Sequence, residues 1–411
     1  MVIARRGISV LENLRSTIQF RELTLDRTGA KLDRAANIDD LRAMAKRRLP
    51  GGVFDYIDGG AEDEKSLSRN TTDFDRWSFR PRVLRDMTEL DTSVELLGKR
   101  IPHPLVLSPT GFSRIADSQG ELAVARSAQR MGLPYSLSSM ATRSIEEVAA
   151  VSDSSKWFQV YVWKDRGIVK EMVGRAQGAG YDAICITVDF ATLGRRERDV
   201  RRGFTLPPKI GLDTIVDGLL HPRWTLDFVQ SEPILFANVS GTDGKDGTDA
   251  VGLADYVKNQ LDPSLSWDDI EWFRSIWDGP IVIKGVQDVA DVDVAAKLGI
   301  EAVALSNHGG RQLDDAPSPI ELVPEAVEVA AGRTQILCDG GVRRGADIVK
   351  ALCLGATACM VGRAYLYGLG AAGERGVDKA LGFLTSEVER TMALVGANAV
   401  GELGPDYLTT R

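Results

Sequence analysis

The chain has 411 residues, of which 44% are hydrophobic, enough to bury one large core. Its formal net charge of −8 and its pI near 5.2 argue against nucleic acid as the main partner, which would need a clustered basic face. Neither a run of about 18 apolar residues nor the apolar centre of a secretory signal occurs, so we expect no membrane span and no secretion. We expect a cytoplasmic protein that binds a small molecule.

Residues 1–103 are expected to form a helical extension of a single domain that spans residues 1–411. The stretch "NIDDLRAMAKRRLP" predicts a helix, because Asn37 can cap its first turn and Pro50 cannot continue it. The glycine-rich and acidic stretch "GGVFDYIDGGAEDE" follows this helix directly.

Eight short apolar runs follow, separated by segments with helical periodicity. They begin at Pro104, Pro134, Trp157, Ala183, Pro280, Ala302, Gln335 and Ala358. The runs show little alternation, as expected of parallel strands covered on both faces. Eight such units predict an α/β protein with a (β/α)8 TIM barrel in residues 104–194 and 270–411. A doubly wound sheet is the competing layout, but no GxGxxG follows the first strand.

One gap between consecutive strands, the gap after the fourth, is much longer than the others. It holds an insertion over residues 195–269 that includes the Gly-, Asp- and Thr-rich "GTDGKDGTD". We expect this insertion loop to lie above the mouth of the barrel, over the active site.

The predicted strand ends are unusually polar. They are Thr110, Ser138, Ser139, Tyr161, Asp189, Lys284, His308, Asp339, Gly362 and Arg363. In this fold the active site collects at the carboxyl ends of the strands. Capping and turns explain one or two polar strand ends, but not a carboxylate, an ammonium, an imidazole and a phenol at one mouth.

His308 lies in "SNHGGRQLD", where the chain leaves a predicted strand. The carboxylate of Asp189 can hold the imidazole in one tautomer, which leaves the other nitrogen to take a substrate proton. Arg311 can bind a carboxylate through two parallel hydrogen bonds. These residues suit a carboxylic acid whose neighbouring carbon bears an oxygen and is oxidised.

Lys284, at the end of the fifth strand, has alternative interpretations that the residues leave open. It adds a positive charge to the mouth, and it can serve as a salt-bridge partner. It can also form a Schiff base, as the lysine of barrel aldolases does at a strand end. A barrel that only binds phosphate or has a structural role is the remaining alternative.

The loops after the seventh and eighth strands suit a phosphate group. "DGGVRRG" and "GRA" combine bare backbone amides with Arg343, Arg344 and Arg363. Barrel phosphate sites lie at these two loops. The cysteines, which are Cys185, Cys338, Cys353 and Cys359, lie in apolar runs without metal-ligand spacing, so we expect reduced core thiols and no metal site.

Eight motifs together resemble one known family. They are "YIDGGAEDE", "FQVYVWKD", "TVD", "GRRERD", "KGV", "SNHGGRQLD", "DGGVRRG" and "GRAYLYGL", in the family's order over residues 37–408. The chain resembles the FMN-dependent L-2-hydroxy acid dehydrogenases and oxidases, which include lactate and mandelate dehydrogenases and, more distantly, glycolate oxidases. The resemblance implies a barrel with FMN at its mouth and an L-2-hydroxy acid as substrate, with L-lactate as the first choice.

The resemblance also implies roles for individual residues. His308 is the base and Asp189 steadies its cation, while Arg311 and Tyr56 bind the substrate carboxylate. Tyr161 hydrogen-bonds the substrate oxygen, Arg196 helps to hold the ligand, and Lys284 faces flavin N1 and O2. The other expected cofactor contacts are Pro109, Thr110, Gly111, Ser138, Gln159, Thr187, Ser306, Asp339, Gly341, Arg343, Gly362 and Arg363.

Two departures from the family pattern bear on substrate and acceptor. Met140 stands where glycolate oxidases carry tryptophan, which makes glycolate a less suitable substrate. Gly111 stands where the oxidases commonly have alanine, as in members that pass electrons to a quinone or cytochrome. We therefore expect a dehydrogenase with a separate quinone or similar carrier; an oxygen-using oxidase and a mandelate dehydrogenase are the alternatives.

The segment "LLHPRWTLDFV" resembles the one by which membrane-associated family members touch the bilayer. Peripheral contact through residues 204–240, at the inner face of the membrane, is therefore one expectation. The segment carries no excess of basic residues to attract anionic lipid, so packing under a loop or between subunits is an equal alternative. By the same resemblance we expect a homotetramer.

Overall fold

The computed structural model describes residues 25–203, 211–239 and 260–411. The chain divides into one compact unit that ends at Ala35 and a second that runs from Ala36 to Arg411. Within the described part of the first unit, helix α2 (Arg27–Leu32) begins after Asp26, whose carboxylate accepts a hydrogen bond from the Gly29 amide at 2.8 Å. The second unit contains the barrel.

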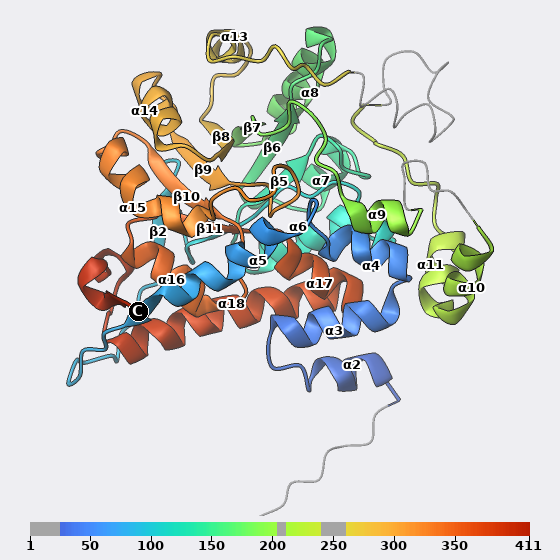
Figure 1. Cartoon of the computed structure of the whole chain (residues 1–411), viewed down its shortest axis with the longest axis horizontal. Helices are drawn as coiled ribbons and strands as arrows, with labels where there is room; N and C mark the ends of the chain where they lie inside the picture. Colours follow the sequence, from blue (N-terminus) through green and yellow to red (C-terminus); the bar gives the residue numbers. More distant parts are fainter. Residues whose placement is uncertain (1–24, 204–210, 240–259) are drawn as a thin grey trace, which may run out of the picture. The chain divides into compact units, whose positions relative to one another are not determined.

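Eight parallel strands close into a barrel, which confirms the predicted fold (Figure 1). In chain order they are β4 (Leu105–Leu107), β5 (Tyr135–Ser138), β6 (Lys156–Tyr161), β7 (Ala183–Thr187), β8 (Ile281–Val286), β9 (Ala302–Ser306), β10 (Gln335–Asp339) and β11 (Ala358–Val361). Each strand pairs with its neighbours in the sequence, and β11 pairs with β4 to close the ring. All eight carboxyl ends therefore meet at one mouth.

Helices alternate with these strands along the chain. They are α6 (Gly120–Arg130), α7 (Ile145–Ala150), α8 (Arg166–Gly178), α13 (Asp269–Ile276), α14 (Val289–Lys297), α15 (Pro319–Ala330), α16 (Gly345–Cys353), α17 (Arg363–Ala372) and α18 (Glu374–Val395), with the 3-10 turn η2 (Ser113–Ile115) before α6. Helix α7 begins with a capping box, in which Ser144 and Glu147 bind each other's backbone amides.

Before the barrel, the described residues of the second unit are mainly helical up to Arg76. They contain α3 (Ile38–Arg48), α4 (Gly51–Asp58), α5 (Lys65–Thr72) and the 3-10 turn η1 (Asp73–Arg76). Helix α3 starts after Asn37, whose side chain accepts the Asp40 amide, as predicted. The expected helical extension also holds three short strands, β1 (Trp77–Phe79), β2 (Val94–Leu96) and β3 (Lys99–Ile101).

These added strands depend on partners distant in the sequence. Strand β1 pairs with β12 (Leu408–Thr410) at the end of the chain, after the turns η3 (Val400–Glu402) and η4 (Pro405–Tyr407). Hairpin β2–β3 packs Leu96 and Ile101 into the barrel interior, and its backbone binds the side chain of Gln335 at the start of β10. The hairpin thus covers the amino-terminal end of the barrel and leaves the carboxyl end for polar groups.

The barrel interior is apolar below the mouth. Trp157, Cys185, Val282, Leu337 and Met360 belong to one buried cluster with the hairpin. All four cysteines are buried and free, as predicted, and burial raises the pKa of Cys185 to about 12. These thiols are packing residues.

The described part of the insertion is more ordered than the expected loop. It contains α9 (Glu197–Arg201), α10 (Leu212–Leu220) and α11 (Pro222–Gln230). Residues 204–210 and 240, within the expected membrane segment, and the stretch "GTDGKDGTD" lie outside the described residues. No helix in the described ranges is long and apolar enough to cross a membrane.

Candidate active site

The barrel brings the predicted polar residues together at its carboxyl end, and every strand contributes. Gln159, Thr187, Lys284, Ser306 and Asp339 lie in or at the ends of their strands. Ser138 and Tyr161 are the last residues of β5 and β6, and Arg363 is the first residue of α17. The loops after the strands hold Pro109, Thr110, Gly111, Asp189, His308, Gly341, Arg343 and Gly362. Tyr56 comes from α4 and Arg196 from the residue before α9, so the site includes two elements outside the barrel.

His308 is held between a carboxylate and a phenol. Its Nδ1 lies 3.0 and 3.3 Å from the two oxygens of Asp189, and its Nε2 lies 3.4 Å from the hydroxyl of Tyr161. Burial, with the nearby charge of Asp189, raises the pKa of Tyr161 well above its ordinary value, so the phenol keeps its proton. The arrangement leaves Nε2 as the nitrogen that can exchange a proton with a ligand.

Gly285 makes room for the carboxylate of Asp189. Strand β8 is irregular between Lys284 and Val286, and Gly285 has a φ of +109°. A Cβ atom at this position would lie 2.6 Å from Cγ of Asp189. Glycine in "KGV" is therefore needed both for its backbone conformation and for its lack of a side chain.

Lys284 and Asp339 form a buried ion pair across the mouth. Their charged atoms lie 2.6 Å apart, and their side chains are 5% and 10% exposed. Ser306 donates to one oxygen of Asp339, and Ser108 donates to the other, each at 2.7 Å. Burial alone would lower the pKa of Lys284, but the charges of Asp339 and Asp189 outweigh it and raise that pKa. The lysine is therefore a fixed cation.

Uncharged polar side chains line the carboxyl ends of β4, β5, β6 and β7. Gln159 accepts a hydrogen bond from Ser138 at 2.9 Å and donates one to Thr187 at 2.8 Å. Thr110 lies 2.7 Å from the hydroxyl of Tyr365, which in turn donates to the Ser108 carbonyl. These groups offer amide and hydroxyl donors and acceptors without a net charge.

Two arginines face the ring of Tyr56. The guanidinium carbons of Arg311 and Arg196 lie 5.1 and 5.4 Å from the ring centroid. Arg311 donates to the carbonyls of Tyr56 and Gly59, and it pairs with no carboxylate in the described part of the chain. Burial and the charge of Arg196 lower the pKa of Arg311. A bound anion would relieve this uncompensated positive charge.

The predicted phosphate residues are only partly arranged for a phosphate. The guanidinium of Arg343 donates to the Val342 carbonyl and lies over the Tyr367 ring, and no carboxylate in the described ranges pairs with it. Arg363 differs, because its three side-chain nitrogens donate to backbone carbonyls of Ile57, Gly59 and Gly309. A direct contact of Arg363 with phosphate stays a prediction.

Several neighbours of the site were not found from the sequence. The ring of Phe190 lies 4.5 Å from that of Tyr161 and 5.6 Å from that of His308. Gln312 binds the Asp189 and Thr192 carbonyls, and Asp199 lies 3.7 Å from Arg196. Phe190 directly follows Asp189 and Gln312 directly follows Arg311 in the sequence. This adjacency to predicted site residues is the signal that could have identified them.

Comparisons with known proteins agree with this site. A family model described as FMN-dependent dehydrogenase matches residues 45–410. A putative L-lactate dehydrogenase from Mycobacterium tuberculosis is 42% identical over 410 residues, which cover 100% of this chain and 97% of that protein. An (S)-mandelate dehydrogenase from Pseudomonas putida is 41% identical over 373 residues, covering 90% and 93%. The crystal structure of a monotopic membrane protein, (S)-mandelate dehydrogenase, has a TM-score of 0.88 at 40% identity and covers 91% and 99%.

The donor set at the mouth fits FMN. Neutral donors and acceptors from Gln159 and its neighbours suit the polar edge of a flavin ring, and Lys284 adds a cation on the next strand. At the opposite side, after β10, the guanidinium of Arg343 pairs with no carboxylate in the described ranges, which suits a phosphate. The chemistry therefore changes around the mouth from neutral to cationic, as FMN requires.

A pair of glycine variants tests how Asp189 is accommodated. We expect Gly299→Ala to lower the free energy of unfolding by about 1 to 2 kcal/mol, because its φ of +68° strains alanine while the added Cβ contacts nothing. Gly285→Ala should lose about 1 to 3 kcal/mol more, from overpacking against Asp189. Denaturant unfolding measures both, and equal losses would show that Asp189 moves aside freely.

Proposed function

The chain belongs to the FMN-dependent dehydrogenase family, and from that premise we propose that it oxidises an L-2-hydroxy acid, first of all L-lactate, to the 2-oxo acid. One observation carries the proposal. The hydroxyl of Tyr161 lies beside His308 and within the electrostatic influence of Asp189, Arg196 and Arg311. The imidazole of His308, a proton acceptor, thus stands near the two cations Arg196 and Arg311. This arrangement suits a carboxylate with a hydroxyl on the adjacent carbon.

Each residue has a defined task in the proposed reaction. Arg311, with Arg196 and Tyr56, binds the substrate carboxylate, because a planar guanidinium matches its two oxygens. Tyr161, which keeps its proton, donates to the substrate oxygen. Nε2 of His308 takes a proton from the hydroxyl or from the α-carbon, and Asp189 stabilises the resulting imidazolium from Nδ1. The position of Nε2 suits removal of either the hydroxyl proton or the α-carbon proton.

FMN, when bound, supplies the two-electron acceptor for this oxidation. Lys284 keeps its charge through Asp339 and so can stabilise negative charge at the mouth. A charged, ion-paired ammonium is a poor nucleophile, which argues against the alternative Schiff-base aldolase. The same set of groups also suits (S)-mandelate, the substrate named in a relative, with the flexible Met140 as part of the wall.

The first test of the function is optical. The purified protein should be yellow and should lose its flavin absorbance when L-lactate is added without oxygen, while D-lactate leaves it unchanged. Anaerobic titrations with L-lactate and (S)-mandelate rank the two substrates. Denaturation that releases no flavin would refute the proposal at its basis.

Two substitutions separate proton transfer from substrate binding. His308→Ala should bind FMN but reduce it roughly 10²- to 10⁴-fold more slowly, because general-base catalysis is lost. Arg311→Lys should mainly weaken substrate binding, because a point charge replaces a planar fork. Stopped-flow flavin reduction at varied L-lactate measures both effects, and a normal limiting rate in His308→Ala would exclude this histidine as the base.

We further propose that the electron acceptor is a quinone or similar carrier. Gly111 supports this, because the family's oxidases commonly carry alanine there. Gly111 also lies close to the loop after β5, since an added Cβ would approach Cβ and the carbonyl oxygen of Met140 to 3.0 and 3.1 Å. An alanine therefore needs a small shift of Met140.

Reoxidation tests the acceptor. Reduced protein should pass electrons to a soluble quinone much faster than to oxygen, and Gly111→Ala should react faster with oxygen while keeping its FMN content. Stopped-flow mixing with air-saturated buffer and with quinone compares the rates. A wild-type protein that prefers oxygen would instead be an oxidase.

We also propose that α10 and α11 dock at the inner face of a membrane. Helix α11 is fixed to the barrel, because Trp224 donates to the Ile115 carbonyl and Asp227 accepts from Ser118. Leu219 and Leu220 of α10, by contrast, are 72% and 73% exposed. A relative described as a monotopic membrane protein supports the proposal. Packing between subunits is the alternative, and the homotetramer stays a prediction.

Vesicle binding decides between the bilayer and a subunit contact. A Leu219→Ser/Leu220→Ser variant should sediment less with phosphatidylcholine vesicles, and added salt should have little effect, because apolar burial dominates. Leu394→Ser, which removes an equally exposed leucine from α18, is the matched control. A variant that binds vesicles normally but changes its oligomeric mass would favour the subunit contact.

A further inference from the structure

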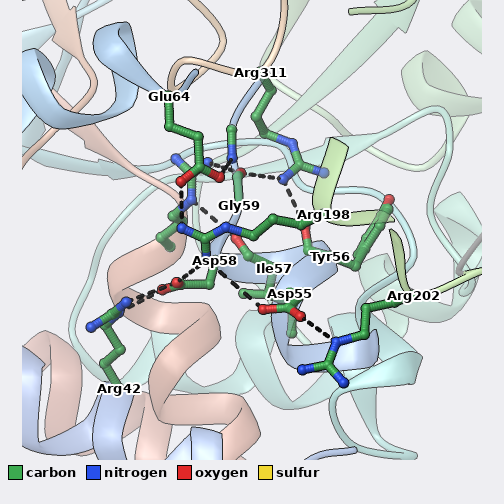
Figure 2. Close-up of polar contacts among 12 residues, drawn as sticks. Arg42, Asp55, Tyr56, Ile57, Asp58, Gly59, Glu64, Arg198, Arg202 and Arg311 are labelled. Atoms are coloured by element: carbon green, nitrogen blue, oxygen red, sulfur yellow. Dashed lines mark hydrogen bonds and ion pairs between the residues drawn. The ribbon is translucent and has the colours of Figure 1, made fainter. Parts of the chain in front are cut away.

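Ion pairs join the beginning of the insertion to the helix that carries Tyr56. Figure 2 shows Arg198 and Arg202, from the region of α9, alongside Asp55, Asp58 and Glu64, from α4 and the turn after it. None of these five residues belongs to the site described above. They nevertheless lie directly beside two of its members, because Arg196 precedes α9 and Tyr56 is in α4.

Arg198 is the centre of this contact. Its Nη1 donates to Asp58 at 3.0 Å and lies 3.8 Å from Asp55, while its Nη2 donates to Glu64. Glu64 also accepts the Gly60 amide at 2.9 Å, which fixes its carboxylate. Arg202 adds a second connection, donating to Asp55 at 3.0 Å.

Asp58, one of the carboxylates that Arg198 binds, is itself held by two further side chains. Its side chain is 3% exposed and also accepts hydrogen bonds from Arg42 and from the hydroxyl of Tyr367. Burial would raise the pKa of Asp58, but hydrogen bonds from Arg42, Tyr367 and Arg198 lower it to about 2. The carboxylate stays charged, so loss of Arg198 would leave part of a buried charge uncompensated.

Backbone hydrogen bonds also connect α4 and the turn after it to the residues around Arg196 and Arg311. The Glu62 amide donates to the Arg195 carbonyl at 2.9 Å, and Arg311 donates to the Tyr56 carbonyl at 2.7 Å. The guanidinium of Arg198 is occupied by its carboxylates and is not directed at His308. Its effect on a ligand must therefore pass through the position of Arg196 and Tyr56.

We infer that Arg198 is a positioning residue, whose pairs with Asp58 and Glu64 clamp the start of the insertion onto α4 and so hold Arg196 beside Tyr56 for the substrate carboxylate. This inference rests on the proposed function. The clamp joins two segments far apart in the sequence, so it orders a carboxylate site that the barrel alone does not complete. Part of it is accessible to water, since the side chain of Arg198 is 32% exposed, and salt should weaken it.

Substitution at Arg198 tests the clamp against a matched control on the same helix. Arg198→Met should raise KM for L-lactate about tenfold and change kcat by less than about threefold, because ground-state and transition-state binding are lost alike. Arg198→Lys, which keeps a single charge, should recover part of the loss. Arg201→Met removes an arginine that is 70% exposed and whose one ion pair among the described residues is with Glu197 of its own helix. It should leave KM unchanged.

A merely structural role predicts a different result. In that case Arg198→Met would lower the amount of folded protein or its FMN content, while KM of the remaining holoenzyme stayed unchanged. That result would overturn the inference. An equal rise of KM in Arg201→Met would overturn it as well, because the effect would then be one of net charge. If Arg198→Met does not fold, Glu64→Gln in the same assay removes one of the two pairs, and an unchanged KM there also contradicts the clamp.

Hydrogen exchange separates failure of the clamp from failure of the proposed function. Amides of residues 195–203 should exchange faster in Arg198→Met holoenzyme than in wild type or Arg201→Met. This readout requires no substrate. If wild type oxidises no 2-hydroxy acid, the function fails while the exchange comparison still tests the clamp; unchanged exchange in an active enzyme refutes the clamp alone.

Discussion

The closed ring of eight parallel strands is the constraint on which the rest of this structure depends. Because apolar side chains and hairpin β2–β3 fill the ring from its amino-terminal end, charged groups can enter it only at the carboxyl end. A charge inside the ring itself must be paired, since an isolated buried charge costs several kcal/mol. The Lys284–Asp339 pair with its two serines satisfies that demand and also supplies the fixed cation of the site.

The barrel alone supplies only part of the ligand-binding groups. His308, Asp189 and Lys284 come from strand ends, whereas Tyr56 and Arg196 come from outside the ring. Close backbone packing brings these elements together, since a Cβ at Gly194 would lie 2.2 Å from the Arg311 carbonyl oxygen. The chemistry of proton transfer thus belongs to the barrel, and recognition of a carboxylate depends on how other segments pack onto it.

Much of the architecture could be predicted because its signals are local. Apolar runs with helical segments between them indicated the barrel, and Asn37 marked a helix start through a hydrogen bond that spans three residues. Position at strand ends was enough to collect His308, Asp189, Lys284 and Asp339 as site candidates. The resemblance to a family added Tyr56 and Arg196, which no periodicity could place near the mouth.

By itself, the sequence determined the strand order, the direction of the strands and therefore the side of the barrel on which the polar residues gather. Only the tertiary structure decided the hairpin that closes the other end, the pairing of β1 with β12, and the binding of Arg363 to carbonyls of α4 and of the turn after β9. It likewise decided the ion pairs of Arg198 with Asp58 and Glu64. The reason is physical: periodicity and capping act over one or two turns of chain, whereas a contact between distant segments depends on packing and charge compensation and has no spacing of its own.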